Sequence, residues 1–502
     1  MNDQTTTYDV IVIGGGAVGE NVADRTVQGG LSTVIVESEL VGGECSYWAC
    51  MPSKALLRSG AALSAARRVG GAAEAATGEL DVAAVLRRRD SFTSHWSDDG
   101  QVGWLDSAGI ALVRGHARLS GVREVTVTGA DGTTSVLTAR HAVVVSTGSS
   151  AVLPDIPGIG IVDPWTSREA TSAQHVPESL AIIGGGVTAA EMATAYTSLG
   201  AKVTLIVRHS LLGKEEPFAG ELVIEALRAA GATVLTGEAP VLAMRAADGT
   251  VVLTLASGGT VTANEVLVAT GRTPRTEDVG LASVGLPDGD WLTVDDTLLV
   301  QGDAADLAGD WLYATGDVTH RALLTHQGKY QARAAGDVIV ARASGRAVDD
   351  APWGTHVATA DHSAVPQVTF TDPEVASVGL TQAAAEKAGL RIRVLDYPIG
   401  NVAGASLQAD GYTGMARAVV DLDREVLVGV TFVGQDVSEL LHAATIAVVG
   451  EVPIARLWHA VPAYPTMSEV WLRLLEAYGR PYRGLRCPLP RDRIALTGAD
   501  RR

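Results

Sequence analysis

A glycine-rich turn between an apolar strand and a helix constrains this chain more than any other feature. The strand-like run Tyr8–Ile13 leads into residues 14–19, which read Gly-Gly-Gly-Ala-Val-Gly. A helix-compatible stretch follows, and a second strand-like run, Ser32–Val36, ends at the acidic residue Glu37. This order of strand, glycine turn, helix, strand and acid predicts a Rossmann-like unit that binds a dinucleotide.

The three glycines of the turn have separate physical roles. Gly14, Gly16 and Gly19 occupy the glycine positions of G-x-G-x-x-G, where a side chain would block the tight turn or the approach of a pyrophosphate. The pyrophosphate would then face backbone N–H groups at the positive end of the helix. Glu37 is placed to accept hydrogen bonds from a ribose.

The pattern recurs in the second quarter of the chain. Ser179–Ile183 is strand-like and leads into residues 184–189, Gly-Gly-Gly-Val-Thr-Ala, with Gly184 and Gly186 at the first two glycine positions. The next strand-like run is Lys202–Val207. A second dinucleotide unit is therefore predicted, and two such sites indicate electron transfer between a tightly held flavin and a diffusing nicotinamide.

The second unit ends in cations where the first ends in an acid. Arg208 and His209 follow the strand directly, and Lys214 comes shortly after them. Positive charge suits the 2′-phosphate of NADP, whereas the bare ribose of NAD favours an acid. The expected cofactors are therefore FAD in the first unit and NADPH in the second.

Two of the three cysteines form a close pair. Cys45 and Cys50 lie within residues 42–54, Gly-Gly-Glu-Cys-Ser-Tyr-Trp-Ala-Cys-Met-Pro-Ser-Lys, and the third cysteine is Cys487 near the end of the chain. At a helix start the positive end of the helix favours the thiolate, so the pair can alternate between disulfide and dithiol. No further Cys or His stands nearby at zinc-site spacing, and no metal site is predicted.

The rest of the chain follows the same α/β logic. We predict a FAD-binding domain over residues 1–160, an NADPH-binding domain over 161–285, a second FAD-binding or central segment over 286–360, and a C-terminal α+β dimerisation domain over 361–490. The alternating stretches after about residue 360 predict an antiparallel sheet covered by helices.

Charge and hydropathy exclude some partners. A net charge of −18 argues against nucleic acid and anionic membranes, which attract basic proteins. No apolar run approaches the roughly 18–20 residues that span a bilayer, and the polar start of the chain carries no secretory signal, so a cytoplasmic location is expected.

Taken together, these motifs resemble the class I pyridine nucleotide-disulfide oxidoreductases, a family that includes dihydrolipoamide dehydrogenase, glutathione reductase and mercuric reductase. The likeness extends over about residues 8–480. It includes both glycine turns, the segment around Cys45 and Cys50, Thr270-Gly271-Arg272, Thr315-Gly316-Asp317 and the C-terminal Pro-Thr-Met-Ser-Glu of residues 465–469.

The resemblance implies roles for matching residues. Cys50 would face the flavin, Cys45 would be the interchange thiol, and Lys54 would pair with Glu191 near the flavin. The residues implied to hold FAD are Gly14, Gly16, Gly19, Glu37, Gly115, Ala117, Thr147, Gly148 and Asp317. Those implied to hold the nicotinamide dinucleotide are Gly184, Gly186, Arg208, His209, Lys214 and Arg272. The family also implies a homodimer in which the C-terminal domain completes the partner's active site.

One position departs from the family pattern. Disulfide reductases of this type carry His before Pro-Thr-x-x-Glu, whereas this chain has Tyr464, with the acid Glu469 retained. An ordinary phenol has a pKa of about 10 and is a poor general base at neutral pH. His442 and His459 are expected on the surface rather than as substitutes.

This departure leaves the small-molecule acceptor open. The main hypothesis is NADPH-dependent reduction of a thiol-reactive or disulfide acceptor through Cys45 and Cys50. Mercuric-ion reduction is one alternative, because a metal ion needs thiolates more than a proton shuttle, but Cys487 is single where mercuric reductases carry a pair. Direct reduction of a quinone or dye by the flavin is another, and a redox sensor with little turnover is a third.

Overall fold

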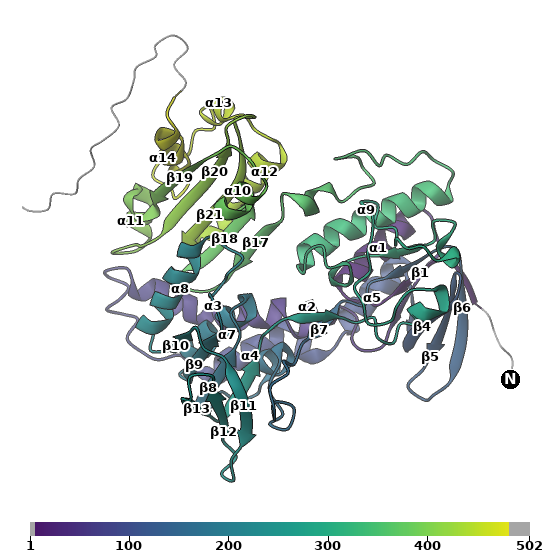
Figure 1. Cartoon of the computed structure of the whole chain (residues 1–502), viewed down its shortest axis with the longest axis horizontal. Coiled ribbons are helices and arrows are strands. Elements are labelled where there is room, and N and C mark those ends of the chain that lie inside the picture. The colour runs from purple at the N-terminus through teal and green to yellow at the C-terminus, as the bar shows by residue number, and fades with distance from the viewer. Residues whose placement is uncertain (1–5, 481–502) are drawn as a thin grey trace, which may run out of the picture.

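The computed structural model describes residues 6–480. Its first layer is a sheet in the order β3-β2-β1-β6-β5-β4, with β16 pairing on β6 (Figure 1). The strands are β1 (Thr6–Ile13), β2 (Thr33–Glu37), β3 (Ala111–Arg114), β4 (His116–Gly121), β5 (Glu124–Thr128), β6 (Thr134–Val145) and β16 (Leu312–Ala314). The pairs among β1, β2, β3, β6 and β16 are parallel, and β4, β5 and β6 form an antiparallel extension.

Helices cover this sheet because its central strands are apolar on both sides. In β1, Val10 to Ile13 are all buried, as expected for a parallel strand between two helical layers. Helix α1 (Ala17–Gln28) packs along α9 (Thr325–Ala343), and α5 (Asp99–Ala108) contacts both α1 and β3. The carboxyl ends of β1, β2 and β6 are thereby brought to one edge, where open α/β sheets bind ligands.

The second sheet has the order β10-β9-β8-β14 and is parallel throughout. Its strands are β8 (Ser179–Ile183), β9 (Lys202–Val207), β10 (Thr233–Thr236) and β14 (Glu265–Val268), and its helices are α7 (Val187–Ser198) and α8 (Pro217–Ala229). A three-stranded sheet of β11 (Pro240–Arg245), β12 (Val251–Leu255) and β13 (Thr260–Ala263) accompanies it. Two short strands, β7 (Ser149–Ala151) and β15 (Arg272–Pro274), pair where the chain passes between the two units.

The C-terminal unit is an antiparallel sheet in the order β17-β18-β21-β20-β19. Its strands are β17 (Pro366–Thr369), β18 (Glu374–Gly379), β19 (Ile392–Pro398), β20 (Met415–Asp421) and β21 (Val426–Gly434). Helices α12 (Leu441–Val449) and α14 (Glu469–Tyr478) pack on it, and α10 (Gln382–Lys387), α11 (Ala403–Gln408) and α13 (Ile454–Leu457) are short.

The redox segment belongs to a helical region next to the first two sheets. It comprises α2 (Gly43–Tyr47), α3 (Cys50–Arg67), α4 (Val82–Phe92) and α6 (Ser167–Ser172), and α3 contacts α7 of the second unit. Figure 1 shows this region between the first sheet and the C-terminal unit. Within residues 6–480, no helix combines the length and apolar character that a bilayer crossing requires.

The predicted α/β architecture is confirmed. The strand-like stretch of residues 111–118 is divided at Gly115, whose φ of +152° turns the chain between β3 and β4. Strand β6 is long because it pairs with β5 at one end and with β1 at the other. Helix α14 begins at Glu469, after the turn that follows Pro465.

Candidate active site

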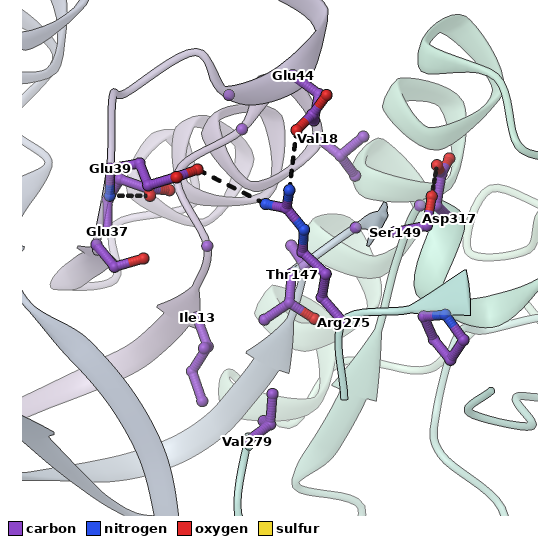
Figure 2. Close-up of a pocket in the computed structure, with 18 of the residues that line it drawn as sticks. Ile13, Val18, Glu37, Glu39, Glu44, Thr147, Ser149, Arg275, Val279 and Asp317 are labelled. Carbon is purple, nitrogen blue, oxygen red and sulfur yellow. Dashed lines mark hydrogen bonds and ion pairs between the residues drawn. The ribbon is translucent and has the colours of Figure 1, made fainter. Parts of the chain in front are cut away.

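A cavity of about 350 Å³ opens at the carboxyl ends of β1, β2 and β6 (Figure 2). It extends from Glu37 and Ala117 at one end to Cys45, Asp317 and Thr325. The sequence-predicted residues that line it are Gly14, Gly16, Glu37, Cys45, Gly115, Ala117, Thr147, Gly148, Arg272 and Asp317. Arg272, which the resemblance assigns to the nicotinamide site, thus lines the first cavity.

The glycine turn forms one wall of the cavity. Gly14 has φ +101°, and a Cβ there would lie 2.5 Å from the carbonyl oxygen of Ser146, so only glycine fits. The Gly15 N–H donates a hydrogen bond of 2.6 Å to the Glu37 carboxylate, which also accepts one from the Glu39 N–H. The Glu37 carboxylate is therefore held against the glycine turn.

Polar groups at the other end fit a dinucleotide carrying a flavin. The Ser149 hydroxyl donates to Asp317 at 2.5 Å, and Arg272 donates from Nε to the Ser149 hydroxyl. The Thr147 hydroxyl is buried in the cavity wall without a hydrogen-bond partner in the described chain, which leaves it available to a ligand. A glycine-walled cavity with an acid at each end and an unpaired hydroxyl between them matches the chemistry of FAD.

The two cysteines meet beside this cavity as free thiols. Cys45 lies in α2 and Cys50 is the first residue of α3, so the helix N-terminus favours negative charge on Cys50. A hydrogen bond from Cys45 lowers the pKa of Cys50 to about 6; burial opposes this shift, whereas Thr325 and the charge of Lys54 add to it. The Cys50 sulfur is 3.3 Å from the Thr325 hydroxyl.

The same hydrogen bond acts in the opposite direction on Cys45. It raises the pKa of the Cys45 thiol, and burial raises it further. The two opposite shifts favour the negative charge of the pair on Cys50 over Cys45.

Lys54 and Glu191 are brought together from different units. Lys54 Nζ in α3 lies 2.8 Å from the Glu191 carboxylate in α7, whose side chain is only 4% exposed. The second Glu191 oxygen accepts a hydrogen bond of 3.0 Å from the Phe370 N–H, and Lys54 lies 5.0 Å from the Phe370 ring. The predicted pairing of Lys54 with Glu191 is present in the geometry.

The second glycine turn has the same local geometry as the first. Gly184 has φ +148°, and a Cβ there would collide with the carbonyl oxygen of Ala269. Arg208 and His209 follow β9 on the surface, with Arg208 Nε 3.1 Å from the His209 ring, and Lys214 is also exposed. Arg208, His209 and Lys214 are thus all exposed after the end of β9.

The two C-terminal site residues lie in different environments. Tyr464 is 76% exposed, whereas Glu469 is buried. One Glu469 oxygen binds Arg473 of the same helix, and the other is buried without a partner among the described residues. His442 and His459 are exposed, and Cys487 lies outside the described residues.

Some residues of the site could not be anticipated from motifs. Thr325 contacts Cys50 from the start of α9, and no sequence pattern marks it. Glu39, Glu44, Arg168 and Arg275 form an ion-pair cluster at the cavity. The sequence signal that could have pointed to this cluster was position next to a motif, because Glu44 directly precedes Cys45 and Arg275 directly follows Thr-Gly-Arg-Thr-Pro.

Two family models match the chain. Residues 8–342 match pyridine nucleotide-disulphide oxidoreductase, and residues 365–474 match the dimerisation domain of the same family. A dihydrolipoyl dehydrogenase from Thermus scotoductus is 33% identical, covering 94% of this chain and 97% of that protein. A mercuric reductase from Staphylococcus aureus is 30% identical, covering 92% of this chain and 81% of that protein.

Solved structures agree on the fold. The Cu(II) complex of the HOCl-induced flavoprotein disulfide reductase RclA from Escherichia coli has a TM-score of 0.79 at 21% identity, covering 94% of this chain and 99% of that one. LpdA from Mycobacterium tuberculosis has a TM-score of 0.77 at 24% identity, covering 95% and 100%. This chain therefore belongs to the pyridine nucleotide-disulphide oxidoreductase family and is a flavoprotein oxidoreductase that uses FAD and a pyridine nucleotide.

Proposed function

We propose that this chain is an NADPH:acceptor oxidoreductase that delivers electrons through Cys45 and Cys50 to a thiol-reactive or disulfide acceptor. One observation carries the proposal: a dithiol with a strongly acidified member lies beside the cavity that fits FAD. A protein that draws on NADPH to keep thiols reduced would work in the cytoplasm.

The residues around the cavity bind and orient the cofactor in this proposal. Glu37 takes the adenosine ribose, the turn from Gly14 takes the pyrophosphate, and Asp317 takes the polar chain next to the flavin ring. A bound flavin supplies a two-electron relay between the nicotinamide and the dithiol. Lys54, which forms an ion pair with Glu191, places a positive charge near the Cys50 thiolate.

The dithiol then delivers two electrons to the acceptor. The Cys45 sulfur attacks one sulfur of a disulfide acceptor while its proton passes to the departing thiolate, which forms a mixed disulfide and releases one thiol. The Cys50 thiolate then attacks the Cys45 sulfur, closing the Cys45–Cys50 disulfide and releasing a second thiolate, which takes a proton from solvent. The acceptor thus gains two electrons from the dithiol and two protons, one from Cys45 and one from solvent.

The cysteines provide the direct test. Cys50→Ser and Cys45→Ser should each abolish NADPH-dependent reduction of the acceptor, while Cys487→Ser, which leaves both site sulfurs intact, should retain it. An anaerobic NADPH titration should also produce a long-wavelength flavin–thiolate band that Cys50→Ser lacks. Unchanged acceptor reduction in Cys50→Ser would contradict the dithiol route and favour direct exit from the flavin to a quinone or dye.

The preference for NADPH depends on the cations after β9. Arg208, His209 and Lys214 would attract the 2′-phosphate, which NADH lacks. Arg208→Ala should raise KM for NADPH about tenfold and leave KM for NADH unchanged, since one charge-assisted hydrogen bond is worth about 1.5 kcal/mol or more. Lys202→Ala, an exposed cation at the opposite end of β9, is the matched control and should change neither value.

The acceptor side is proposed to include a second copy of the chain. Residues 365–474 match a dimerisation domain, and this unit exposes apolar side chains at Ile446 (57%), Val461 (85%) and Tyr464 (76%). A patch built from such side chains would suit an interface between two copies. Light scattering should give twice the monomer mass, and Ile446→Glu should reduce it to the monomer value.

Mercuric ion is the second candidate acceptor. Tyr464 stands where a disulfide reductase would hold its proton-shuttling imidazole, and several relatives at about 30% identity are mercuric reductases. Hg(II) added with excess thiol should accelerate NADPH oxidation if the chain has this activity. An acceptor panel with glutathione disulfide, lipoamide, mycothiol-like disulfides, quinones and Hg(II) separates the candidates by kcat/KM.

A further inference from the structure

Four charged side chains form a closed ion-pair cluster at the cavity, three of which, Glu39, Glu44 and Arg275, line it, and none is a predicted site residue. Arg275 lies 2.9 Å from Glu44 and 3.7 Å from Glu39. Arg168 lies 2.5 Å from Glu44 and 2.6 Å from Glu39. Figure 2 shows Arg275 reaching between the two carboxylates from the opposite wall.

The cluster is built onto the glycine turn itself. The Gly42 N–H donates a hydrogen bond of 2.8 Å to the carbonyl oxygen of Gly15, and a Cβ on Gly43 would lie 2.9 Å from the Gly16 Cα. Glu44 is the next residue along the chain. Its partner Arg275 therefore lies close to the turn where a pyrophosphate is bound in folds of this type.

A pyrophosphate at this turn would need positive charge nearby. Its lining contains six carboxylates, which are Glu37, Glu39, Glu44, Glu277, Asp278 and Asp317. Two guanidinium groups, Arg272 and Arg275, line it. Arg272 is held at the far end by Ser149, 3.7 Å from Asp317. Two phosphates entering an acidic cavity raise its electrostatic energy unless a cation is close, and Arg275 is the guanidinium placed at the turn.

We propose that Arg275 is a binding residue for the pyrophosphate of FAD, with Arg168 left to neutralise Glu39 and Glu44 when the cofactor is in place. Arginine suits the task because its planar guanidinium can bind carboxylate and phosphate oxygens at the same time. The inference rests on the assignment of this cavity to FAD.

Arg168 also connects the cluster to the redox segment. Its guanidinium stacks on the Trp48 ring at 4.2 Å, and the Trp48 carbonyl accepts a hydrogen bond of 2.9 Å from Thr171 of the same helix α6. Trp48 lies between the two cysteines in sequence. The cluster therefore connects the cavity wall to the dithiol segment, and Arg275 is its cation that lines the cavity.

A purely structural role for Arg275 makes a different prediction from phosphate binding. If Arg275 only neutralises Glu44, removing both charges together should restore normal FAD affinity. If Arg275 binds the phosphates, the double variant should bind FAD as weakly as the single arginine variant. Glu44→Gln alone should not weaken binding, because it removes a negative charge from beside the pyrophosphate.

The test measures FAD retention by the purified holoenzyme. Flavin fluorescence after dialysis, followed by titration with FAD, gives Kd for the wild type, Arg275→Gln, Glu44→Gln and the double variant, and Arg391→Gln at a surface ion pair far along the chain is the matched control. We expect Kd to rise at least tenfold in Arg275→Gln and in the double variant, and to stay unchanged in the control. Arg275→Lys, which keeps the charge but not the planar group, should lie between wild type and Arg275→Gln.

The outcomes distinguish the role of Arg275 from the assignment of the cavity to FAD. A wild-type Kd in Arg275→Gln, or restored affinity in the double variant, would overturn the role of Arg275 and leave the flavoprotein intact. Thermal unfolding of the FAD-free proteins shows whether a weak variant is merely unstable, since the glutamine variants should unfold within a few degrees of the wild type. A wild-type protein that binds no FAD would instead overturn the assignment of the cavity.

Discussion

The acidity of Cys50 depends first on Cys45, and replacing Cys45 by alanine tests that dependence. The pKa of Cys50 is lowered from 9.0 to about 6, with the hydrogen bond from Cys45 as the largest cause. This difference corresponds to about 4 kcal/mol in favour of the thiolate. At pH 7, one unit above the pKa, about nine-tenths of Cys50 is ionised.

The size of the change follows from the bond that is lost. A hydrogen bond to a charged group contributes about 1.5–3 kcal/mol, or roughly one to two pH units. Cys45→Ala should therefore move the pKa of Cys50 to about 7–8 and reduce the ionised fraction at pH 7 to about half or less. Thr325, Lys54 and the helix N-terminus remain, so the value should stay below that of an ordinary thiol.

The rate of alkylation by iodoacetamide, measured in the reduced enzyme from pH 4 to 10, reports the thiolate directly. Cys45→Ala leaves Cys50 as the reactive site thiol, and Ser46→Ala in the same short helix is the matched control, with an expected midpoint near that of the wild type. The wild type should show a midpoint near 6. A midpoint that stays near 6 in Cys45→Ala would refute the idea that Cys45 sets this acidity.

Three further predictions follow from other contacts. Burial raises the pKa of Glu20 from 4.5 to about 7, so its ionisation lowers the free energy of unfolding as pH rises from about 4.5 to about 7 and has no further effect above that; Glu20→Gln should be more stable than wild type at pH 8 by up to about 3 kcal/mol and gain nothing at pH 4, as denaturant titration will show. Lys54→Met leaves the buried carboxylate of Glu191 without its cation and should lower the free energy of unfolding by about 1–3 kcal/mol, less than for a fully buried pair because the Lys54 side chain is 34% exposed; Glu191→Gln added in the same chain should largely recover this loss, and equal stability of the two variants would contradict the pairing. Tyr464→His introduces an imidazole that titrates near neutrality and should raise kcat for lipoamide or glutathione disulfide at pH 7 at least tenfold; no change would show that the acceptor does not need this proton.

Local patterns predicted the elements of the site better than its contacts. The turn from Gly14, the acid at Glu37 and the dithiol were all predictable, because a turn geometry and a helix N-terminus are encoded by neighbours in sequence. The contact between Thr325 and Cys50 was not predictable, because the position of α9 beside the cysteines depends on the pairing of β16 with β6 in the first sheet. Such contacts arise from strand order, which periodicity does not reveal.

The same limit applies to charges. Arg275 lies beside a recognised motif, but its reach to Glu39 and Glu44 depends on how β15 pairs with β7. Glu469, the acid retained in the motif after Tyr464, accepts a hydrogen bond in the described chain from Arg473, one helical turn away. The cation that pairs with a carboxylate is the one that tertiary packing places beside it. Sequence spacing alone is compatible with several candidates.

The contact of Lys54 with Glu191 and Phe370 joins three units of the protein at one point. Rotation of the second unit, which carries α7, away from α3 would have to break this contact, in which the Glu191 side chain is only 4% exposed. Access to the flavin is therefore expected to be controlled by a single side chain or loop that swings aside, while the framework of the three units stays still throughout turnover.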